Sequence, residues 1–243
     1  MIKLEIDSKV FVGISTVSDG NMSFVWGDEA GVVKNRQGLI KKAGLKAEEL
    51  SVVQLEHGKK VVLLQKSIGN ALDRSKAESI VTDAIATDRP RLATMLLVGD
   101  CIPAVLYDQR RPALVLIHAG RKGVELNLIK EAVEFMQRSF GSKPADLLLK
   151  SGPSIGKNSY VFDDSKDLDL DFWGQYCKLG DDQKYHLDVS GKFGAQAKQA
   201  GLADNSISIS PIDTFTDKNY FSHRRSMATG EPEGRFAILA YIK

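Results

Sequence analysis

The sequence predicts an α+β fold in which mixed β-sheets are covered by helices, within one domain spanning residues 1–243. First, 43% hydrophobic and 26% charged residues are typical of a folded globular chain of this length. Second, apolar strand-like segments lie in pairs and alternate irregularly with helical patterns, unlike the regular strand–helix repeat of a parallel α/β protein. Third, we find no repeat, low-complexity tract or linker that would divide the chain.

In the first part of the chain, residues 2–15 have the pattern of one or two strands. Residues 28–45 predict a helix, because apolar residues recur at helical spacing and the segment ends in a Gly-Leu pair. Residues 51–65 are β-branched and apolar on both sides of His57-Gly58, which predicts a strand interrupted at that pair. Residues 78–90 predict a loop with a short strand or helical turn.

The middle of the chain predicts a hairpin with arms at 92–107 and 113–118, followed by a helix at 125–141. This helix has one apolar face and ends at Gly141. The apolar face comprises Leu126, Ile129, Val133, Met136 and Phe140. The remaining predicted elements are a strand leading into a Gly-Pro loop within 146–162, a helix at 190–202 with Ser190 as N-cap and Gly201 past its end, and strands at 206–210 and 235–242.

Composition excludes several classes of function. A net charge of +2 does not support a general nucleic-acid binder. The apolar runs are all shorter than the roughly 20 residues that cross a bilayer, so we expect no membrane partner. The first residues lack the basic segment and apolar run of a signal peptide, and two distant cysteines do not form a disulfide framework. We therefore expect a cytoplasmic protein with reduced thiols.

Reactive residues interrupt the predicted hairpin. Asp100, Cys101 and His118 stand where a core hairpin usually has Val or Thr. A two-residue turn at Gln109-Arg110 would place Cys101 opposite His118, with Cβ atoms roughly 5 Å apart. This pairing is open to two interpretations. Cys101 could be a nucleophile with His118 as its base, or both could bind zinc with a third ligand.

His57 is the natural third zinc ligand, because it lies at a strand break next to Gly58. Three protein ligands would leave one position open for water or substrate. Asp100 has two open roles: it supports the ring of a histidine ligand, or it caps the turn.

Basic residues near these positions predict an anion site. Arg121 and Lys122 lie between Gly120 and Gly123, just before the expected helix. A second cluster, His223-Arg224-Arg225, lies near the C-terminus. Arginine forks suit phosphate or carboxylate groups, so both clusters are candidate substrate-binding residues.

An ordered set of motifs covers nearly the whole chain. It begins with VKNRQGL at 33–39 and His-Gly at 57–58, and continues with GDCIP at 99–103 and HAG at 118–120. GPSIG at 152–156 and YFSHRR with a following Thr-Gly and Arg at 220–235 complete it. In this order the motifs resemble the YfiH family, whose members were named polyphenol oxidoreductase laccases.

The resemblance implies a domain with α/β/β/α layers and a metal site, usually zinc, at His57, Cys101 and His118. It also implies a purine nucleoside substrate, because members have been associated with purine nucleoside phosphorylase, adenosine deaminase and methylthioadenosine phosphorylase activities. The expected enzyme is therefore a zinc-dependent purine nucleoside phosphorylase in which phosphate attacks the ribose carbon. Cys101, His118 and His57 are the expected catalytic residues.

The sequence departs from the family pattern around the expected ligands. Leu55-Glu56 replaces Gln-Val before His-Gly, Gly99 replaces Ala, and Arg121-Lys122 replaces Trp-Arg. The alternatives are accordingly a Cys–His hydrolase, or a metal-binding member that has lost catalysis. A laccase mechanism is rejected, because four histidines are too few for a blue-copper site together with a copper cluster.

Overall fold

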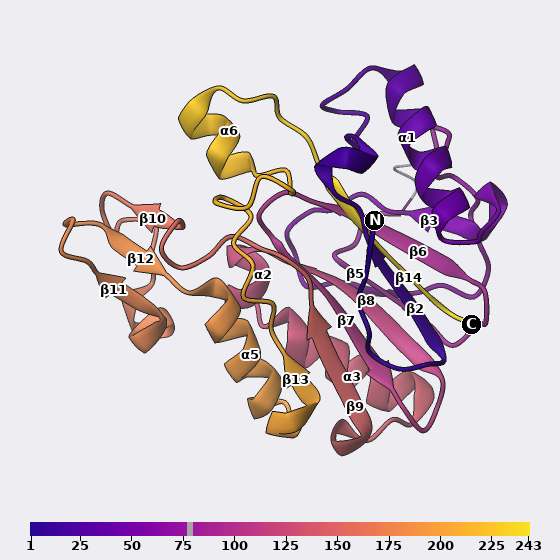
Figure 1. The fold of residues 1–243 in the computed structure, drawn as a ribbon. Helices are drawn as coiled ribbons and strands as arrows, with labels where there is room; N and C mark the ends of the chain where they lie inside the picture. The colour runs from indigo at the N-terminus through magenta and orange to yellow at the C-terminus, as the bar shows by residue number, and fades with distance from the viewer. Residues whose placement is uncertain (77–79) are drawn as a thin grey trace.

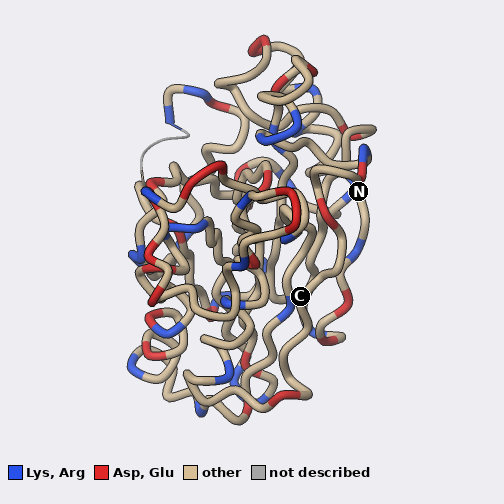
Figure 2. Tube along the Cα trace, turned by 90° about the vertical axis from the view of Figure 1, so that its left-hand side faces the viewer, with Lys and Arg blue, Asp and Glu red and all other residues tan. Residues whose placement is uncertain are grey.

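The computed structural model describes residues 1–76 and 80–243, and Figure 1 shows their arrangement in layers. Two mixed sheets are stacked in the centre, helices α3 and α5 cover one outer face, and α1 covers the other. The predicted α+β class and its α/β/β/α layers are confirmed. Figure 2 shows Lys and Arg interspersed with Asp and Glu along the trace.

The first sheet has five strands in the order β1-β2-β14-β6-β3. Its strands are β1 (Ile2–Lys3), β2 (Val10–Ile14), β3 (Leu50–Val52), β6 (Ala93–Val98) and β14 (Phe236–Ile242). Strand β3 runs parallel to β6, while the other neighbours are antiparallel, so the sheet is mixed. The strands predicted at the N-terminus and at 235–242 are confirmed.

The second sheet has six strands in the order β13-β9-β7-β8-β5-β4. Its strands are β4 (Val61–Leu63), β5 (Ala84–Thr87), β7 (Ile102–Asp108), β8 (Ala113–Ala119), β9 (Leu147–Ser151) and β13 (Ile207–Ser208). The predicted break at His57-Gly58 is confirmed, because β3 and β4 join different sheets. Of the segment 78–90, Glu78 and Ser79 lie outside the described residues, and β5 is the expected short strand.

A small third sheet with the order β10-β12-β11 lies beside α5, outside the central layers (Figure 1). Its strands are β10 (Val161–Phe162), β11 (Cys177–Leu179) and β12 (Tyr185–Leu187). The sequence did not predict it, because each strand is short and partly exposed.

Residues 1–76 and 80–243 form six α-helices. They are α1 (Glu29–Lys42), α2 (Arg121–Glu125), α3 (Leu128–Phe140), α4 (Leu170–Trp173), α5 (Val189–Gln199) and α6 (His223–Thr229). Short 3₁₀ turns cover Val17–Asp19, Ala47–Glu49, Pro144–Asp146, Gly174–Tyr176 and Asp204–Ser206. Among the described residues, no helix has the length and apolar content needed to span a bilayer.

Two helix predictions are wrong in detail. The helix expected at 125–141 begins later, at Leu128, because Asn127 adopts a left-handed conformation with φ 57°; the short helix α2 that precedes Asn127 was not predicted. Leu126 is consequently 39% exposed instead of facing the core. The N-cap of α5 is Asp188, whose carboxylate accepts a hydrogen bond from the Gly191 N–H, and Ser190 lies within the helix. The predicted end of α3 at Gly141 is confirmed.

The hairpin register is also corrected. Residues 92–107 are not one arm: β6 and β7 belong to different sheets, and the chain crosses between them at 99–101. Strands β7 and β8 do form a hairpin, but four residues lie between Asp108 and Ala113. Pro103 therefore lies opposite His118, and the expected opposition of Cys101 and His118 is wrong by two residues.

Strand alternation decides where the reactive residues point. Leu114 and Leu116 of β8 face the core between the two sheets, whereas Val115 and Ile117 face α3. His118 continues the inter-sheet face by the two-residue period of a strand. By the same period, Asp83 follows Ile85 onto that face. Polar residues thus extend the inter-sheet layer at one end of the molecule.

Candidate metal centre and substrate cavity

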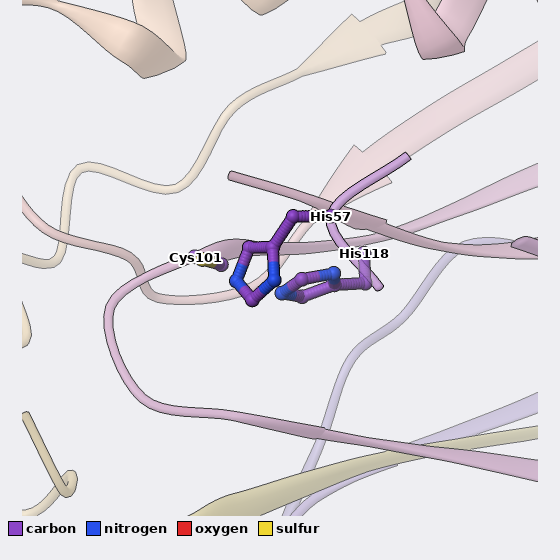
Figure 3. A group of neighbouring side chains, drawn as sticks. All are labelled: His57, Cys101 and His118. Atoms are coloured by element: carbon purple, nitrogen blue, oxygen red, sulfur yellow. The ribbon is translucent and has the colours of Figure 1, made fainter. Parts of the chain in front are cut away.

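His57, Cys101 and His118 come together at this end of the inter-sheet layer. Each contributes a ligand atom, and these atoms all lie within 4.8 Å of one another. The ring centroids of His57 and His118 are 4.9 Å apart, and Figure 3 shows the three side chains converging from three segments of the chain. Two imidazoles and a thiol are a donor set that zinc prefers, with bonds of about 2.0–2.3 Å. The residues present therefore fit a metal ion of this kind.

Asp83 organises the two histidines of this group. It is fully buried, and its Oδ1 accepts a hydrogen bond from His118 Nδ1 at 2.9 Å. The backbone N–H groups of His57 and Gly58 also donate to its carboxylate, at 3.0 and 2.6 Å. Because Nδ1 of His118 is engaged, Nε2 is the nitrogen left for a metal.

The sequence analysis missed Asp83. The one available signal in the sequence was a single aspartate just before an apolar strand. Aspartate is common in the turns that precede strands, so this position did not stand out. Its partners are 25 or more residues away in sequence, and they are brought to it by the sheet.

Asp100 fixes the segment that carries Cys101. Its Oδ1 accepts a bond from Thr214 Oγ1 at 2.7 Å, and its Oδ2 accepts one from the Arg224 backbone N–H at 2.6 Å. Its φ of 92° is unusual for a residue other than glycine, and these bonds hold it there. Of the two roles left open for Asp100, its described contacts match stabilisation of the turn, while Asp83 supports the histidine ring.

The electrostatics favour a charged Cys101–His118 pair. Burial raises the pKa of the Cys101 thiol, but the charge of His118 and hydrogen bonds from His118 and His57 outweigh it and lower the pKa to about 6. Burial lowers the pKa of His118, but the Cys101 thiolate and the Asp83 carboxylate raise it to about 9. A thiolate is the form of cysteine that binds metals and also the form that attacks carbon.

The three candidate ligands line a cavity of about 800 Å³. This volume lies in the range of small-molecule sites. Aromatic and apolar side chains line part of it, namely Phe24, Val25, Trp26, Tyr160 and Met227. Basic side chains line other parts, namely Arg36, Arg121, Lys122, His223, Arg224 and Arg235.

The Arg121-Lys122 pair reaches the cavity from inside a helix, not from before it. Helix α2 begins at Arg121, so the predicted position ahead of the helix is wrong. Arg121 Nη1 donates to Glu125 Oε1 at 3.0 Å and to the Asp167 carbonyl at 2.6 Å. Lys122 is exposed at the cavity wall and forms no ion pair with the described residues. Of the two, Lys122 is the one whose charge is not already paired.

The three basic residues of the C-terminal cluster have different surroundings. Arg224 lines the cavity, with its guanidinium 4.8 Å from the centroid of the Tyr160 ring. Arg225 is buried and does not line the cavity; it pairs with Glu231 and donates to the carbonyls of Thr214, Phe215 and Tyr220. Its described contacts are those of a residue that stabilises the loop before α6.

His223 lines the cavity as part of a hydrogen-bonded group. Its Nδ1 donates to Glu233 Oε1 at 2.9 Å, and the same oxygen accepts a bond from Arg235 Nη1 at 2.5 Å. The Glu233 side chain is 11% exposed, and its bonds to His223 and Arg235 orient both of these side chains. The sequence analysis missed Glu233, because nothing in its local sequence separates it from an ordinary surface glutamate.

A sequence model of the family described as multi-copper polyphenol oxidoreductase laccase matches residues 10–243. The chain belongs to this family. Its expected membership of the YfiH group within it is confirmed by the relatives and structures that follow.

Several curated relatives cover most of the chain. A purine nucleoside phosphorylase of Mycobacterium tuberculosis is 29% identical over 220 residues, which are 89% of this chain and 81% of that protein. The purine nucleoside phosphorylase YlmD of Bacillus subtilis is 27% identical over 210 residues, which are 81% of this chain and 73% of that protein.

Solved structures share the fold. YlmD from Geobacillus stearothermophilus superposes with a TM-score of 0.88 at 23% identity, covering 97% of this chain and 93% of that one. The YfiH protein of Bacillus licheniformis gives 0.86 at 24% identity, covering 96% of this chain and 93% of that one. At these identities the comparison supports the fold alone.

Proposed function

We propose that this protein is a zinc-dependent purine nucleoside phosphorylase. The observation that carries the proposal is the His57–Cys101–His118 group at one end of a cavity that is also lined by aromatic and basic side chains. The relatives named purine nucleoside phosphorylase support the same substrate class.

In the proposed reaction, a phosphate oxygen forms a bond to C1′ of the ribose while the bond from C1′ to N9 of the purine breaks. The electron pair of that bond leaves with the base, which takes up a proton, and ribose 1-phosphate is the second product. His57, Cys101 and His118 would hold Zn²⁺, with Asp83 orienting His118. When bound, the metal would supply Lewis-acid polarisation of a substrate oxygen.

The cavity walls would bind the rest of the substrate. Aromatic faces at Trp26 and Tyr160 suit a purine ring, which stacks on aromatic side chains. Lys122, Arg121 and Arg224 would neutralise the negative charge that gathers as phosphate meets the ribose. His223, held by Glu233, would contact substrate at the cavity wall, whereas Arg225 would act only by stabilising the loop that precedes α6.

The test is to incubate the pure protein with adenosine, inosine and methylthioadenosine, with and without phosphate, while measuring bound zinc. Chromatography should show free base and ribose 1-phosphate (5-methylthioribose 1-phosphate from methylthioadenosine) appearing only with phosphate. Both products should disappear when zinc is removed by a chelator and return when it is restored. Inosine formed from adenosine without phosphate would indicate deamination, in which a water is activated instead. Stoichiometric zinc without turnover of any of these would reject the phosphorylase and leave a binding function.

A Cys–His hydrolase is the second candidate, favoured by the lowered pKa of Cys101 beside His118. In that case the Cys101 sulfur would form a bond to a substrate carbonyl carbon while the bond from that carbon to its amine breaks, and His118 would give the proton to the departing amine. Water would then cleave the thioester and restore Cys101. Removing zinc separates the two: a hydrolase keeps its activity, and the phosphorylase loses it. We expect no copper cluster in either case.

A further inference from the structure

Arg36 is a buried cation inside the substrate cavity. It lies on α1 and is 1% exposed, yet it is one of the residues that line the cavity. Its Nε donates to the Met22 carbonyl at 2.8 Å and its Nη1 to the Ala71 carbonyl at 2.6 Å. Its guanidinium also lies 4.2 Å from the centroid of the Phe24 ring. These contacts fix the planar group rigidly in one orientation.

No described residue neutralises the charge of Arg36. Among residues 1–76 and 80–243, no carboxylate forms an ion pair with it, and its Nη2 has no acceptor there. Carbonyl oxygens and an aromatic face satisfy part of the guanidinium without cancelling its charge. Burying a charge without a counter-charge is costly, so such a group is usually paired or functional.

Arg225 gives the comparison within the same fold. It is also a buried arginine that donates to backbone carbonyls, but its Nε is 2.8 Å from the Glu231 carboxylate. Arg225 does not line the cavity, and Arg36 does. Of these two buried arginines, Arg36 is therefore the one that lines the cavity and has no carboxylate partner among the described residues.

We propose that Arg36 forms an oxyanion subsite of the cavity and binds inorganic phosphate. This rests on the proposed function, in which phosphate is the second substrate. A rigid guanidinium with an unused N–H edge matches a phosphate oxygen in geometry and in charge. The cavity, at about 800 Å³, has room for a nucleoside and phosphate together. Bound phosphate would supply the counter-charge that the described protein groups do not.

The experiment measures binding of inorganic phosphate to the full-length zinc-loaded protein by isothermal titration calorimetry, against chloride at equal ionic strength and without nucleoside. Arg36→Lys keeps the positive charge but loses the fork, so phosphate affinity should fall by about tenfold or more. Arg91→Lys is the matched control. Arg91 also donates to a carbonyl, of Gly44, and lies over an aromatic ring, of Tyr241, but it pairs with Glu49 and lies outside the cavity.

Unchanged phosphate affinity in a folded Arg36→Lys protein, or no phosphate binding by the wild type, would overturn the proposal. If the variant does not fold, a crystal of the wild type soaked in phosphate decides: phosphate bonded to Arg36 supports the subsite, and phosphate bound elsewhere refutes it. The outcome is separable from that of the proposed function. Phosphate binding at Arg36 without nucleoside cleavage would reject the phosphorylase alone, and nucleoside cleavage with unaltered phosphate binding in Arg36→Lys would reject the subsite alone.

Discussion

At the scale of single residues, one buried carboxylate positions the candidate ligand group. Asp83 binds the ring of His118 and two backbone N–H groups of the turn that carries His57. These bonds, together with the bonds of Asp100 that fix the segment before Cys101, hold all three candidate ligands in place before any metal binds. Preorganisation of this kind reduces the cost of ordering side chains on binding.

Replacing Cys101 by alanine should abolish zinc binding and nucleoside cleavage, because it removes the thiolate ligand. Zinc content by atomic absorption and turnover by chromatography check this. Cys177→Ala is the control, since Cys177 lies on β11 in the small outer sheet and does not line the cavity. Full zinc occupancy in the Cys101 variant would show that the assigned ligand set is wrong.

Asp83→Asn should lower zinc affinity by about 10–100-fold, because the amide supports the ring of His118 less strongly than the carboxylate does. Competition with a chromophoric chelator measures this affinity. Asp108→Asn is the matched control, a buried aspartate whose Oδ1 accepts bonds from Arg110 and Arg111 at the β7–β8 turn. Equal affinities in the two variants would remove Asp83 from the metal site.

Alkylation of Cys101 in zinc-free protein should depend on pH as a thiolate reaction. Its pKa of about 6 lies below the ordinary 9.0, so the thiolate predominates at neutral pH and is lost as the pH falls through 6. Below that pH the rate should drop about tenfold per unit, as the thiolate fraction does. Burial raises the pKa of Cys177, so it should react slowly throughout. Iodoacetamide labelling followed by peptide mass spectrometry gives the alkylation rates of both thiols. Equal pH profiles for the two thiols would contradict the lowered pKa of Cys101. Added zinc should slow the alkylation of Cys101.

At the scale of elements, the site is assembled from the ends of strands and the connections between them. His57 lies between β3 and β4, Cys101 lies between β6 and β7, and His118 lies at the end of β8. Both connections cross from one sheet to the other. The backbone at Gly120 completes the group, since a Cβ there would lie 2.8 Å from Cys101 Sγ and 3.3 Å from His57 Cδ2.

Gly120→Ala should therefore weaken zinc binding while the fold is retained, because the new methyl group displaces two candidate ligands. Calorimetric zinc titration and circular dichroism measure the two effects. Gly38→Ala is the control: nothing lies within 4 Å of a Cβ at Gly38, which is inside α1. That control should bind zinc normally and gain roughly 0.5–1 kcal/mol of stability from helix propensity. Normal zinc affinity in Gly120→Ala would mean that Cys101 and His57 do not bind zinc from the positions next to this glycine.

At the scale of the whole molecule, two stacked sheets create both the core and the cavity. The inter-sheet layer is apolar along most of its length and becomes polar where Asp83 and His118 extend it. The cavity consequently adjoins the core, since Val53 and Val98 belong to the inter-sheet layer and also line the cavity. Family membership agrees with this architecture, which the solved YlmD and YfiH structures share.

Leu116→Ala should lower the free energy of unfolding by about 2–5 kcal/mol, since the side chain is fully buried between the sheets and would leave a cavity. Urea denaturation measures the change. Leu126→Ala is the control, because Leu126 is 39% exposed and should change stability by well under half as much. Similar losses of stability in the two variants would contradict the burial of Leu116 between the sheets.

The sequence predicted much of this fold and part of the candidate site. Helix α1, the end of α3 at Gly141 and the strand break at His57 follow from local patterns, because periodicity and glycine conformations act over a few residues. The hairpin register was wrong because the turn has four residues instead of two, and turn length fixes register. The small outer sheet and α6 were missed, since their short segments carry little periodic signal.

The sequence by itself determined which residue types this protein has for chemistry: a scarce set of histidines, a cysteine in an apolar strand region, and motifs in family order. Only the tertiary structure decided their partners. Asp83 and Glu233 have no local signature, and Arg36 is marked only as part of the VKNRQGL motif; the contacts of all three depend on residues elsewhere along the chain. The physical reason is that local patterns report backbone conformation and burial, whereas hydrogen bonds and uncompensated charges depend on which strands the sheets place side by side.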